Sequence, residues 1–580
     1  MLQTEKKTWA LVLLVGMLPP CLIGLMILKY AIDFPFSDQW EIVPLLVKKA
    51  QGTLTFSDLF AQVNEYRQFF PNLIFVYLGR LTNWDVRYEM LASFLTACAI
   101  SRNVYLLGRK TFQGGGAGQM FAFLLSNLLI FSPAQYENWL MGQQLIFFIP
   151  ILCITTCLLV SYSNLSAQIK FVVCALLSVV SSFSSANGLL CWIVVFPALA
   201  EFGIQGGLKK AKWPTAFWVA GFAGCVALYF YGFQRQPYLP STSEAFAHPL
   251  SAVAYFLAWL GAPLTGNNRY LAPVAAVIGL VLTVLFISAW LFRVRYSGDR
   301  ALKRSLTCWL MIGTYSFMTA ALVTLGRLGY GVEQSLSSRY TTFSLYLIVS
   351  LIHVGVIARG CSRGSRAKDT RLRTARPLIA ATGLIVLYVL ASAVSIRAIY
   401  QQRTRAMQEK ACLLFVNVVA DACKPPDVMT VPDKLPERLN ALDVMGFLRP
   451  GLVKSRSMRD FAGDGKAGSS PGSFDRLLRN GGEFVASGRA ALPYRREPPD
   501  AVLLTYKTET GEAVLFSIAE MNYKGDILKR ILVRDADYAF RWQKTFSEES
   551  LPPDAVGVSA WAFDADTGKA YELDGEHTLR

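Results

Sequence analysis

Long apolar stretches alternate with short polar segments along the first 400 residues of the chain. About 20 consecutive apolar residues are needed to cross roughly 30 Å of hydrocarbon as a helix. The pattern therefore predicts about eleven membrane spans, two of which (118–132 and 169–183) are short. The predicted spans cover residues 9–28, 87–108, 118–132, 145–163, 169–183, 186–202, 213–231, 271–292, 305–324, 340–358 and 377–396.

The segments outside these spans have patterns of their own. In the long first loop, apolar residues recur at helical spacing, and we expect helices lying in the membrane interface over 43–84. After residue 400 the chain is polar, with a helical stretch and a linker over 401–483. Over 484–580 short alternating runs are separated by turn residues, as in AVLLTYK–TETGE–AVLFSIAE and GVSAWAFD–ADTG–KAYELDG. These runs predict β-hairpins in a small antiparallel domain of sandwich type.

Composition and charge support a membrane assignment. The 580 residues are 53% hydrophobic and 17% charged, with mean hydropathy +0.36, a balance that a soluble domain of this size does not tolerate. Net charge is +17, and the short segments on one side of the predicted membrane carry 20 Lys and Arg against 3 on the other. This asymmetry predicts a cytoplasmic N-terminus and a tail outside the membrane. It also accounts for the basic runs through membrane topology and lipid headgroups, so no nucleic-acid partner is expected.

Cysteine and histidine give little sign of a metal centre. Nine of the eleven Cys lie in or beside the predicted spans and are read as small apolar residues. Cys412 and Cys423 lie in the predicted outer part, where a disulfide between them suits an oxidising compartment. The three His are scattered and there is no Cys-x-x-Cys motif, so we expect no zinc site and assign no residue as a metal ligand.

Candidate chemistry begins with Asp38, in the motif SDQWE just beyond the first span. It lies between Phe36 and Trp40, and aromatic residues favour the headgroup level of a membrane. Partial desolvation disfavours the charged form of a carboxylate, so it becomes a stronger base. The alternative is a solvated loop acid, or an N-cap for a helix over 39–50.

A second group of candidates lies in later polar segments. Glu137, in YENWLMGQQ, is an isolated acid between Tyr136 and Trp139, and a salt bridge to Arg67 or Arg339 is the alternative to a catalytic role. Arg339 begins a span and has the planar fork that binds phosphate in a bidentate manner, although snorkelling at a helix end explains it equally well. The remaining candidates are Glu65, Arg67, Arg269 and Arg327, with Asn187 at a break between two spans.

Taken together, the motifs SDQW, NEYRQFFP, YENWLMGQQ, SSFSSANGL and SSRYTT resemble the GT-C superfamily of integral-membrane glycosyltransferases. Protein O-mannosyltransferases and the aminoarabinose transferases of lipid A belong to it, and the motif series is similar to an uncharacterised bacterial family within it. The resemblance covers about residues 10–400 and matches the tail only loosely. Where mannosyltransferases have Asp-Glu in the first loop, this chain has Asp38 followed by Gln39, which leaves the donor sugar open.

The resemblance implies a multi-pass protein of a bacterial cytoplasmic membrane that takes a sugar from a polyprenyl-phosphate donor. The acceptor would be a glycan, a lipid or a protein at the outer face. Asp38 and Glu137 would be catalytic, and Arg339, Arg67 and Arg269 would bind the donor phosphate. The substrate-binding candidates are Glu41, Glu65, Trp40, Trp139, Asn187 and Tyr340. The cofactor stays open, with a divalent cation between Asp38 and the phosphate as one option.

Two other functions compete with transfer. A flippase or transporter of a lipid-linked glycan would place paired ionisable residues deep in the spans and repeat its broken helices in two halves. The chain has few such residues and no such repeat. The third candidate is a non-catalytic scaffold whose β-domain binds glycan or an envelope partner.

Overall fold

The computed structural model describes residues 2–112, 116–203, 212–362, 370–419, 434–463, 472–494, 498–519, 521 and 540–579. It divides into two compact units. We call them the membrane unit (Met1–Ala31, Lys48–Arg80 and Val86–Ile399) and the tail unit (Ile32–Val47, Leu81–Asp85 and Tyr400–Arg580). The segment around Asp38 thus belongs to the same compact unit as the C-terminal tail.

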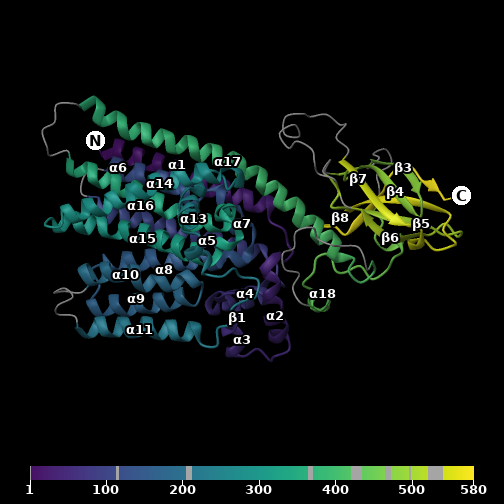
Figure 1. Cartoon of the computed structure of the whole chain (residues 1–580), viewed down its shortest axis with the longest axis horizontal. Coiled ribbons are helices and arrows are strands. Elements are labelled where there is room, and N and C mark those ends of the chain that lie inside the picture. The colour runs from purple at the N-terminus through teal and green to yellow at the C-terminus, as the bar shows by residue number, and fades with distance from the viewer. Residues whose placement is uncertain are drawn as a thin grey trace. The chain divides into compact units, whose positions relative to one another are not determined.

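Helices make up nearly all of the membrane unit (Figure 1). They are α1 Leu2–Tyr30, α3 Phe56–Phe60, α4 Phe69–Thr82, α5 Arg87–Thr111, α6 Gly116–Ile130, α7 Tyr136–Leu140, α8 Leu145–Ser161, α9 Ala167–Ser182, α10 Leu190–Ala198, α11 Lys212–Phe230, α12 Glu244–Ala247, α13 Pro249–Gly261, α14 Ala272–Arg295, α15 Arg300–Arg327 and α16 Ser338–Ser362. Three helices have residues in both units: α4, whose last two residues belong to the tail unit, α2 Val43–Ala50 and α17 Thr370–Leu414.

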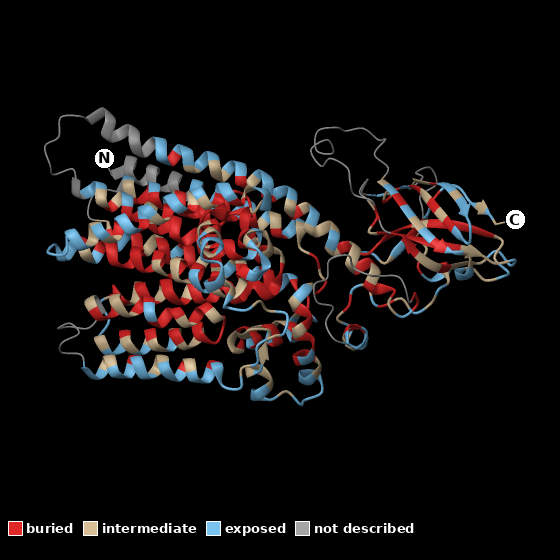
Figure 2. Cartoon of the chain, in the orientation of Figure 1, coloured by how far each residue is buried: buried red, intermediate tan, exposed pale blue. Residues whose placement is uncertain are grey.

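Eight helices in the described ranges are long and apolar enough to cross a bilayer, and four shorter ones are apolar. The predicted number of eleven spans therefore stays a prediction. Helix α8 is mostly buried in the bundle, whereas α11 and α14 leave most of their length exposed (Figure 2). On α14 the exposed side chains include Val277, Leu280 and Leu291. An apolar surface of this extent suits lipid rather than water, so the chain is a polytopic helical membrane protein.

The motif SSFSSANGL forms the sharp break between α9 and α10. Here a 3-10 turn, Ala186–Leu189, brings the backbone of Gly188 back against α9. The Ser181 hydroxyl donates to the Gly188 carbonyl at 2.8 Å, and a Cβ on Gly188 would lie 1.8 Å from the Ser181 carbonyl oxygen. Only glycine fits this close approach of the two backbones. The glycine of the motif is therefore explained by helix packing.

Helices form within the predicted interfacial segment, but as separate pieces. The segment over 43–84 is divided into α2, α3 and α4, the last of which is formed by FFPNLIFVYLGRLT. Between α3 and α4 lies a small hairpin of β1 Gln62–Val63 and β2 Tyr66–Arg67, which carries the NEYR motif. The positive φ of Asn64 (52°) forms its turn, a conformation that Asn tolerates.

The tail unit contains two antiparallel sheets. One has the order β10-β8-β5-β6, with β9 paired to β8, and the other has the order β3-β4-β7. The strands are β3 Gly472–Asn480, β4 Glu483–Ala490, β5 Ala501–Lys507, β6 Ala513–Ala519, β7 Phe540–Ser547, β8 Gly557–Asp564, β9 Lys569–Glu572 and β10 His577–Thr578. Both predicted hairpins form, as β5–β6 and β8–β9. Strand β3 begins at Gly472, whereas the sequence analysis predicted that this domain begins at residue 484.

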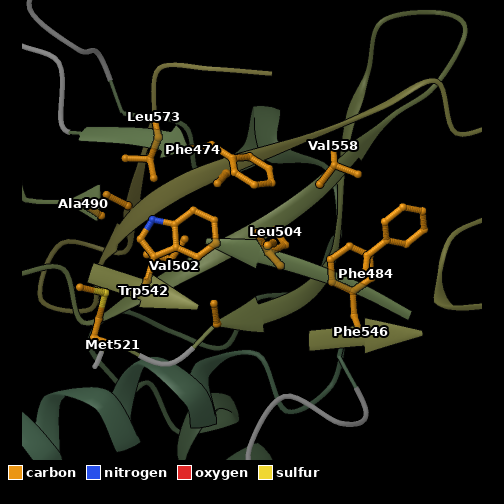
Figure 3. Packing of buried hydrophobic residues seen from close by; sticks show 14 residues of the cluster. Phe474, Phe484, Ala490, Val502, Leu504, Met521, Trp542, Phe546, Val558 and Leu573 are labelled. Carbon is orange, nitrogen blue, oxygen red and sulfur yellow. The ribbon is translucent and has the colours of Figure 1, made fainter. Parts of the chain in front are cut away.

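One apolar core lies between the two sheets (Figure 3). Phe474 and Trp542 from the three-stranded sheet have ring centroids 5.2 Å apart, and Val502, Leu504 and Val558 of the other sheet belong to the same core. This packing is that of a β-sandwich. The tail unit also contains α18, Leu435–Val444. Cys412 is disulfide-bonded, and its predicted partner Cys423 lies outside the described residues.

Truncation of the sandwich core should destabilise the tail unit. We expect Phe474→Ala, which empties a position only 3% exposed, to lower the free energy of unfolding by about 3–5 kcal/mol. The matched control Leu478→Ala lies on the same strand but is 58% exposed, and should change it by less than about 0.5 kcal/mol. Chemical denaturation followed by near-ultraviolet circular dichroism measures both. Equal effects would contradict the assigned strand register.

The tail unit should also lose stability as the pH rises from about 4 to 7. Burial raises the pKa of Asp500 to about 7, and the nearby Asp564 and Asp566 carboxylates act in the same direction. Between the unfolded pKa of about 4 and this value the folded state holds the extra proton, so rising pH favours unfolding. Melting curves across this window should show the decline in wild type and a flatter profile in Asp500→Asn. The exposed Asp554→Asn is the control, and a wild-type profile in Asp500→Asn would refute the assignment.

Candidate functional site

Side-chain hydrogen bonds join three polar segments at one end of the membrane unit, which we call the loop end (residues 131–145, 262–271 and 328–342). Ser338 donates to the Ala134 carbonyl at 3.1 Å, which also accepts from the Asn267 amide. Thr341 donates to Asn267 at 2.9 Å. Asn138 donates to the Arg339 carbonyl at 2.9 Å. The loop end is thereby fixed by contacts between segments distant in sequence, before any ligand is present.

Glu137 and Arg339 meet at this loop end. The Glu137 carboxylate accepts from the Arg339 backbone N–H at 3.0 Å and lies 3.8 Å from its Nε. The Glu137 N–H donates to the Ser338 hydroxyl at 3.2 Å. The salt-bridge alternative for Glu137 is therefore what the structure has, with Arg339 as its partner. The Arg339 side chain is still 44% exposed, and its Nε–H also donates to the Ser337 hydroxyl at 3.2 Å.

Arg67 has a different environment from Arg339. It is buried, and its guanidinium donates to the backbone carbonyls of Tyr229 at 2.7 Å, Phe60 at 3.0 Å and Tyr231. These contacts tie the β1–β2 hairpin to the end of α11. A guanidinium committed to three carbonyls serves the fold, and we leave Arg67 out of the phosphate site proposed below.

Glu65 does not pair with its neighbour Arg67, as a surface pair on a helix would. It forms an ion pair with Arg327 at the end of α15. Its backbone carbonyl accepts from the Tyr229 hydroxyl at 2.8 Å. The hairpin geometry, which the sequence did not predict, turns Glu65 and Arg67 toward different partners.

The other predicted residues of this unit have mostly packing roles. Trp139 is fully buried between Phe131 and Phe148 and donates its indole N–H to Ser132 at 3.0 Å. Two more residues are buried and hydrogen-bonded: Asn187 accepts from Ser185, and the Tyr340 hydroxyl accepts from Gln334. Arg269 is exposed, with its guanidinium 5.3 Å from the Tyr270 ring.

The motif SDQWE forms a 3-10 turn, Ser37–Ile42, in the tail unit. Ser37 has φ +52°, a conformation that costs a non-glycine residue of the order of 1 kcal/mol and that is often found at functional sites. The Gln39 side chain accepts from the Phe36 N–H at 3.2 Å and is fully buried. Asp38 is half-buried, and within the described ranges its carboxylate has no hydrogen-bond or ion-pair partner.

Two arginines of the tail hold this turn in place. Arg438 donates to the Trp40 carbonyl and to the Glu41 carboxylate, both at 2.8 Å, while Trp40 packs edge-on against Phe34. Arg449 lies 3.4 Å from Asp33. The residues on both sides of Asp38 are therefore fixed by packing and ion pairs, while the Asp38 carboxylate has no partner among the residues that the structure describes.

Buried side-chain amides are the residues that the sequence analysis missed. Gln68, Gln143 and Gln144 are at most 5% exposed, and each has one side-chain atom without a partner in the described parts of the chain. The Asn138 side-chain oxygen is in the same state. All four lie in NEYRQFFP or YENWLMGQQ, motifs in which the sequence pointed mainly to charged residues as candidates. Since buried polar atoms are nearly always hydrogen-bonded, these amides have capacity for water or a ligand.

Comparison with known proteins gives one match. Searches of family models and of curated proteins find none. Among solved structures, ArnT from Cupriavidus metallidurans bound to undecaprenyl phosphate matches with a TM-score of 0.40 and 13% identity, over 77% of this chain and 88% of that one. At this score the match adds no argument about activity, which has to be argued from the residues themselves.

Substitution of Arg67 and of Arg339 should affect the stability of the protein to different extents. We expect Arg67→Gln to lower the free energy of unfolding by about 2–4 kcal/mol, because it leaves buried carbonyls without donors. Arg339→Gln should lower it by less than about 1 kcal/mol, since the Arg339 pair is partly exposed. Unfolding of each variant by SDS titration in mixed micelles measures both. If Arg339→Gln were as destabilising as Arg67→Gln, Arg339 would be a structural residue as well.

Proposed function

We propose that the chain is a membrane glycosyltransferase that moves a sugar from a polyprenyl-phosphate donor to a glycan, lipid or protein acceptor. One observation carries the proposal. Of the four acids predicted for the site, Glu41, Glu65 and Glu137 each pair with an arginine, whereas Asp38 is free in the described structure. A positioned carboxylate without a partner is the group expected of a general base.

Asp38 takes the proton of the acceptor in this proposal. The acceptor hydroxyl attacks the anomeric carbon, its proton passes to Asp38, and the bond from that carbon to the phosphate oxygen breaks. The bonding electrons leave with the polyprenyl phosphate. A single displacement of this kind inverts the anomeric configuration, as in inverting glycosidases. The resemblance gives Asp38 this role, and its free carboxylate supports it.

Arg339 binds the donor phosphate in this proposal, with Glu137 as its positioning residue. The Arg339 fork suits two phosphate oxygens and would stabilise the charge that develops on the leaving group. Glu137 holds the start of α16 through the Arg339 N–H, so it orients Arg339 instead of acting as a second base. Arg269, which is exposed, is the further cation that the sequence assigns to this phosphate.

The unpartnered amides support a sugar as the transferred group. Hydroxyls donate and accept hydrogen bonds, and neutral amides can serve both roles without demanding charge on the ligand. Gln68, Gln143 and Gln144 therefore become the substrate-binding candidates of the membrane unit. Within the described chain no group of three or more His, Cys, Asp and Glu side chains is placed to hold a metal ion, and a divalent cation at the phosphate stays an open option.

The charge asymmetry of the sequence supports the proposed orientation, and the family resemblance supports the proposed bacterial membrane. We place the chain in a bacterial cytoplasmic membrane, with the N-terminus in the cytoplasm and the tail unit on the outer side. The donor and the acceptor would then meet at the outer face.

Transfer by purified protein tests the proposal. Full-length wild type, Asp38→Asn and the control Asp58→Asn would be incubated with radiolabelled polyprenyl-phosphate sugars and envelope acceptors. Asp58 lies in the same predicted loop and is half-buried, but it pairs with Lys48. We expect transfer by wild type, a fall of about 10²–10⁴-fold in Asp38→Asn, and little change in the control.

Two results would count against the proposal. A well-folded wild type that transfers none of the sugars would favour the flippase or the scaffold. Transfer that persists in Asp38→Asn would keep the enzyme but remove Asp38 as its base. Size-exclusion profiles of all three proteins show whether a lost activity reflects lost folding.

A further inference from the structure

Three cationic side chains converge on the last residues of α8, at the end of the membrane unit opposite the loop end. The Lys110 ammonium donates to the Tyr162 carbonyl, and the Lys170 ammonium to the Ser161 carbonyl, both at 3.3 Å. The Arg304 guanidinium lies 5.4 Å from the centre of the Tyr162 ring. The three cations come from α5, α9 and α15, so the tertiary fold gathers them.

Positive charge exceeds negative charge at this point. The C-terminus of α8 contributes about half a negative elementary charge, against the two full positive charges of Lys110 and Lys170. Arg304 and Lys110 both lie close enough to Lys170 to repel it. In the described structure the hydrogen bonds of the two lysines go to carbonyls, with no carboxylate partner. The acid on the adjoining helix end, Glu201, is already paired with Arg293 and Lys303.

The different exposure of the three cationic side chains indicates from which side an anion would bind. Lys170 is only 6% exposed, while Lys110 and Arg304 are exposed. A buried ammonium without a counter-ion is costly, and lysine is rarely buried unless it is paired. One buried cation beneath two exposed ones is the arrangement expected for an anion that binds from the surface.

The surface beside this cluster is apolar. Helix α9 begins at Ala167 and runs past Lys170, where its exposed residues Ile169, Val172 and Leu176 recur at helical spacing. They form a stripe that starts at the cluster and continues along the helix. In Figure 1, α9 lies between α8 and α11 on one side of the bundle. An anion with acyl chains matches both the cations and the stripe, whereas a free phosphate would use only the cations.

We propose that Lys110, Lys170 and Arg304 form a binding site for the phosphate headgroup of an anionic membrane lipid, whose acyl chains lie along the exposed stripe of α9. The site is distinct from the proposed transfer chemistry, since it lies at the opposite end of the α8 helix from the loop end. The positive-inside pattern places it in the cytoplasmic leaflet. It would hold a resident lipid that anchors the ends of α5, α8, α9 and α15 together.

Lipid binding to the full-length protein tests this site. Wild type, Lys170→Gln, Lys110→Gln and the control Arg109→Gln would be titrated in detergent with phosphatidylglycerol, phosphatidylcholine or inorganic phosphate, and lipid adducts counted by native mass spectrometry. Arg109 is the exposed neighbour of Lys110 on α5. Since each cation contributes about 1 kcal/mol to binding an anionic lipid, we expect each lysine variant to bind phosphatidylglycerol about fivefold more weakly, with Arg109→Gln unchanged.

Each other outcome would overturn the proposal. Equal binding of phosphatidylglycerol by wild type and both lysine variants would show that the cluster does not contact the headgroup. Equal binding of phosphatidylcholine would show that the charge does not matter. Binding of inorganic phosphate as tight as that of the lipid would show that the stripe does not contribute. If Lys170→Gln does not fold, the exposed Lys110→Gln still decides the result.

Discussion

Removing a charged carboxylate from water costs free energy unless a cation or a hydrogen-bond donor compensates for it. This requirement distinguishes the acids predicted for the site from one another. Glu41 pairs with Arg438, Glu65 with Arg327 and Glu137 with Arg339, and each pair joins segments that lie far apart in the sequence. The same requirement explains the loop end, where Asn and Ser side chains satisfy the carbonyls of segments that leave the helices. With these demands met, Asp38 stands out because its neighbours are fixed while its own carboxylate has no partner in the described part of the chain.

The sequence predicted those parts of the structure that depend on local pattern. Apolar runs gave most of the helices, and alternating runs with turn residues gave the β5–β6 and β8–β9 hairpins. It also offered Arg339 as one of two possible salt-bridge partners of Glu137, because the polar loop of Glu137 and the start of the Arg339 span lie on the same predicted side. Such features follow from short windows of sequence and from counting membrane crossings.

Other features depend on long-range contacts and could not be predicted. Nothing near Arg67 in the sequence shows that its donors go to the end of α11, more than 160 residues away. The contact of SDQWE with Arg438 likewise joins residues 397 positions apart. The buried amides of NEYRQFFP and YENWLMGQQ were visible in the sequence. Their importance became apparent only when burial left them without partners.

The stereochemistry of the product tests the account most directly. Of the four acids predicted for the site, Asp38 alone has no partner in the described structure. If it acts as the base, sugar transfer is one displacement, because a retaining route needs a second carboxylate as nucleophile. Proton NMR of the newly formed glycosidic bond, compared with the donor, gives both anomeric configurations. The account predicts inversion. Retention would contradict it, since one of the paired acids would then have to leave its arginine and attack the sugar.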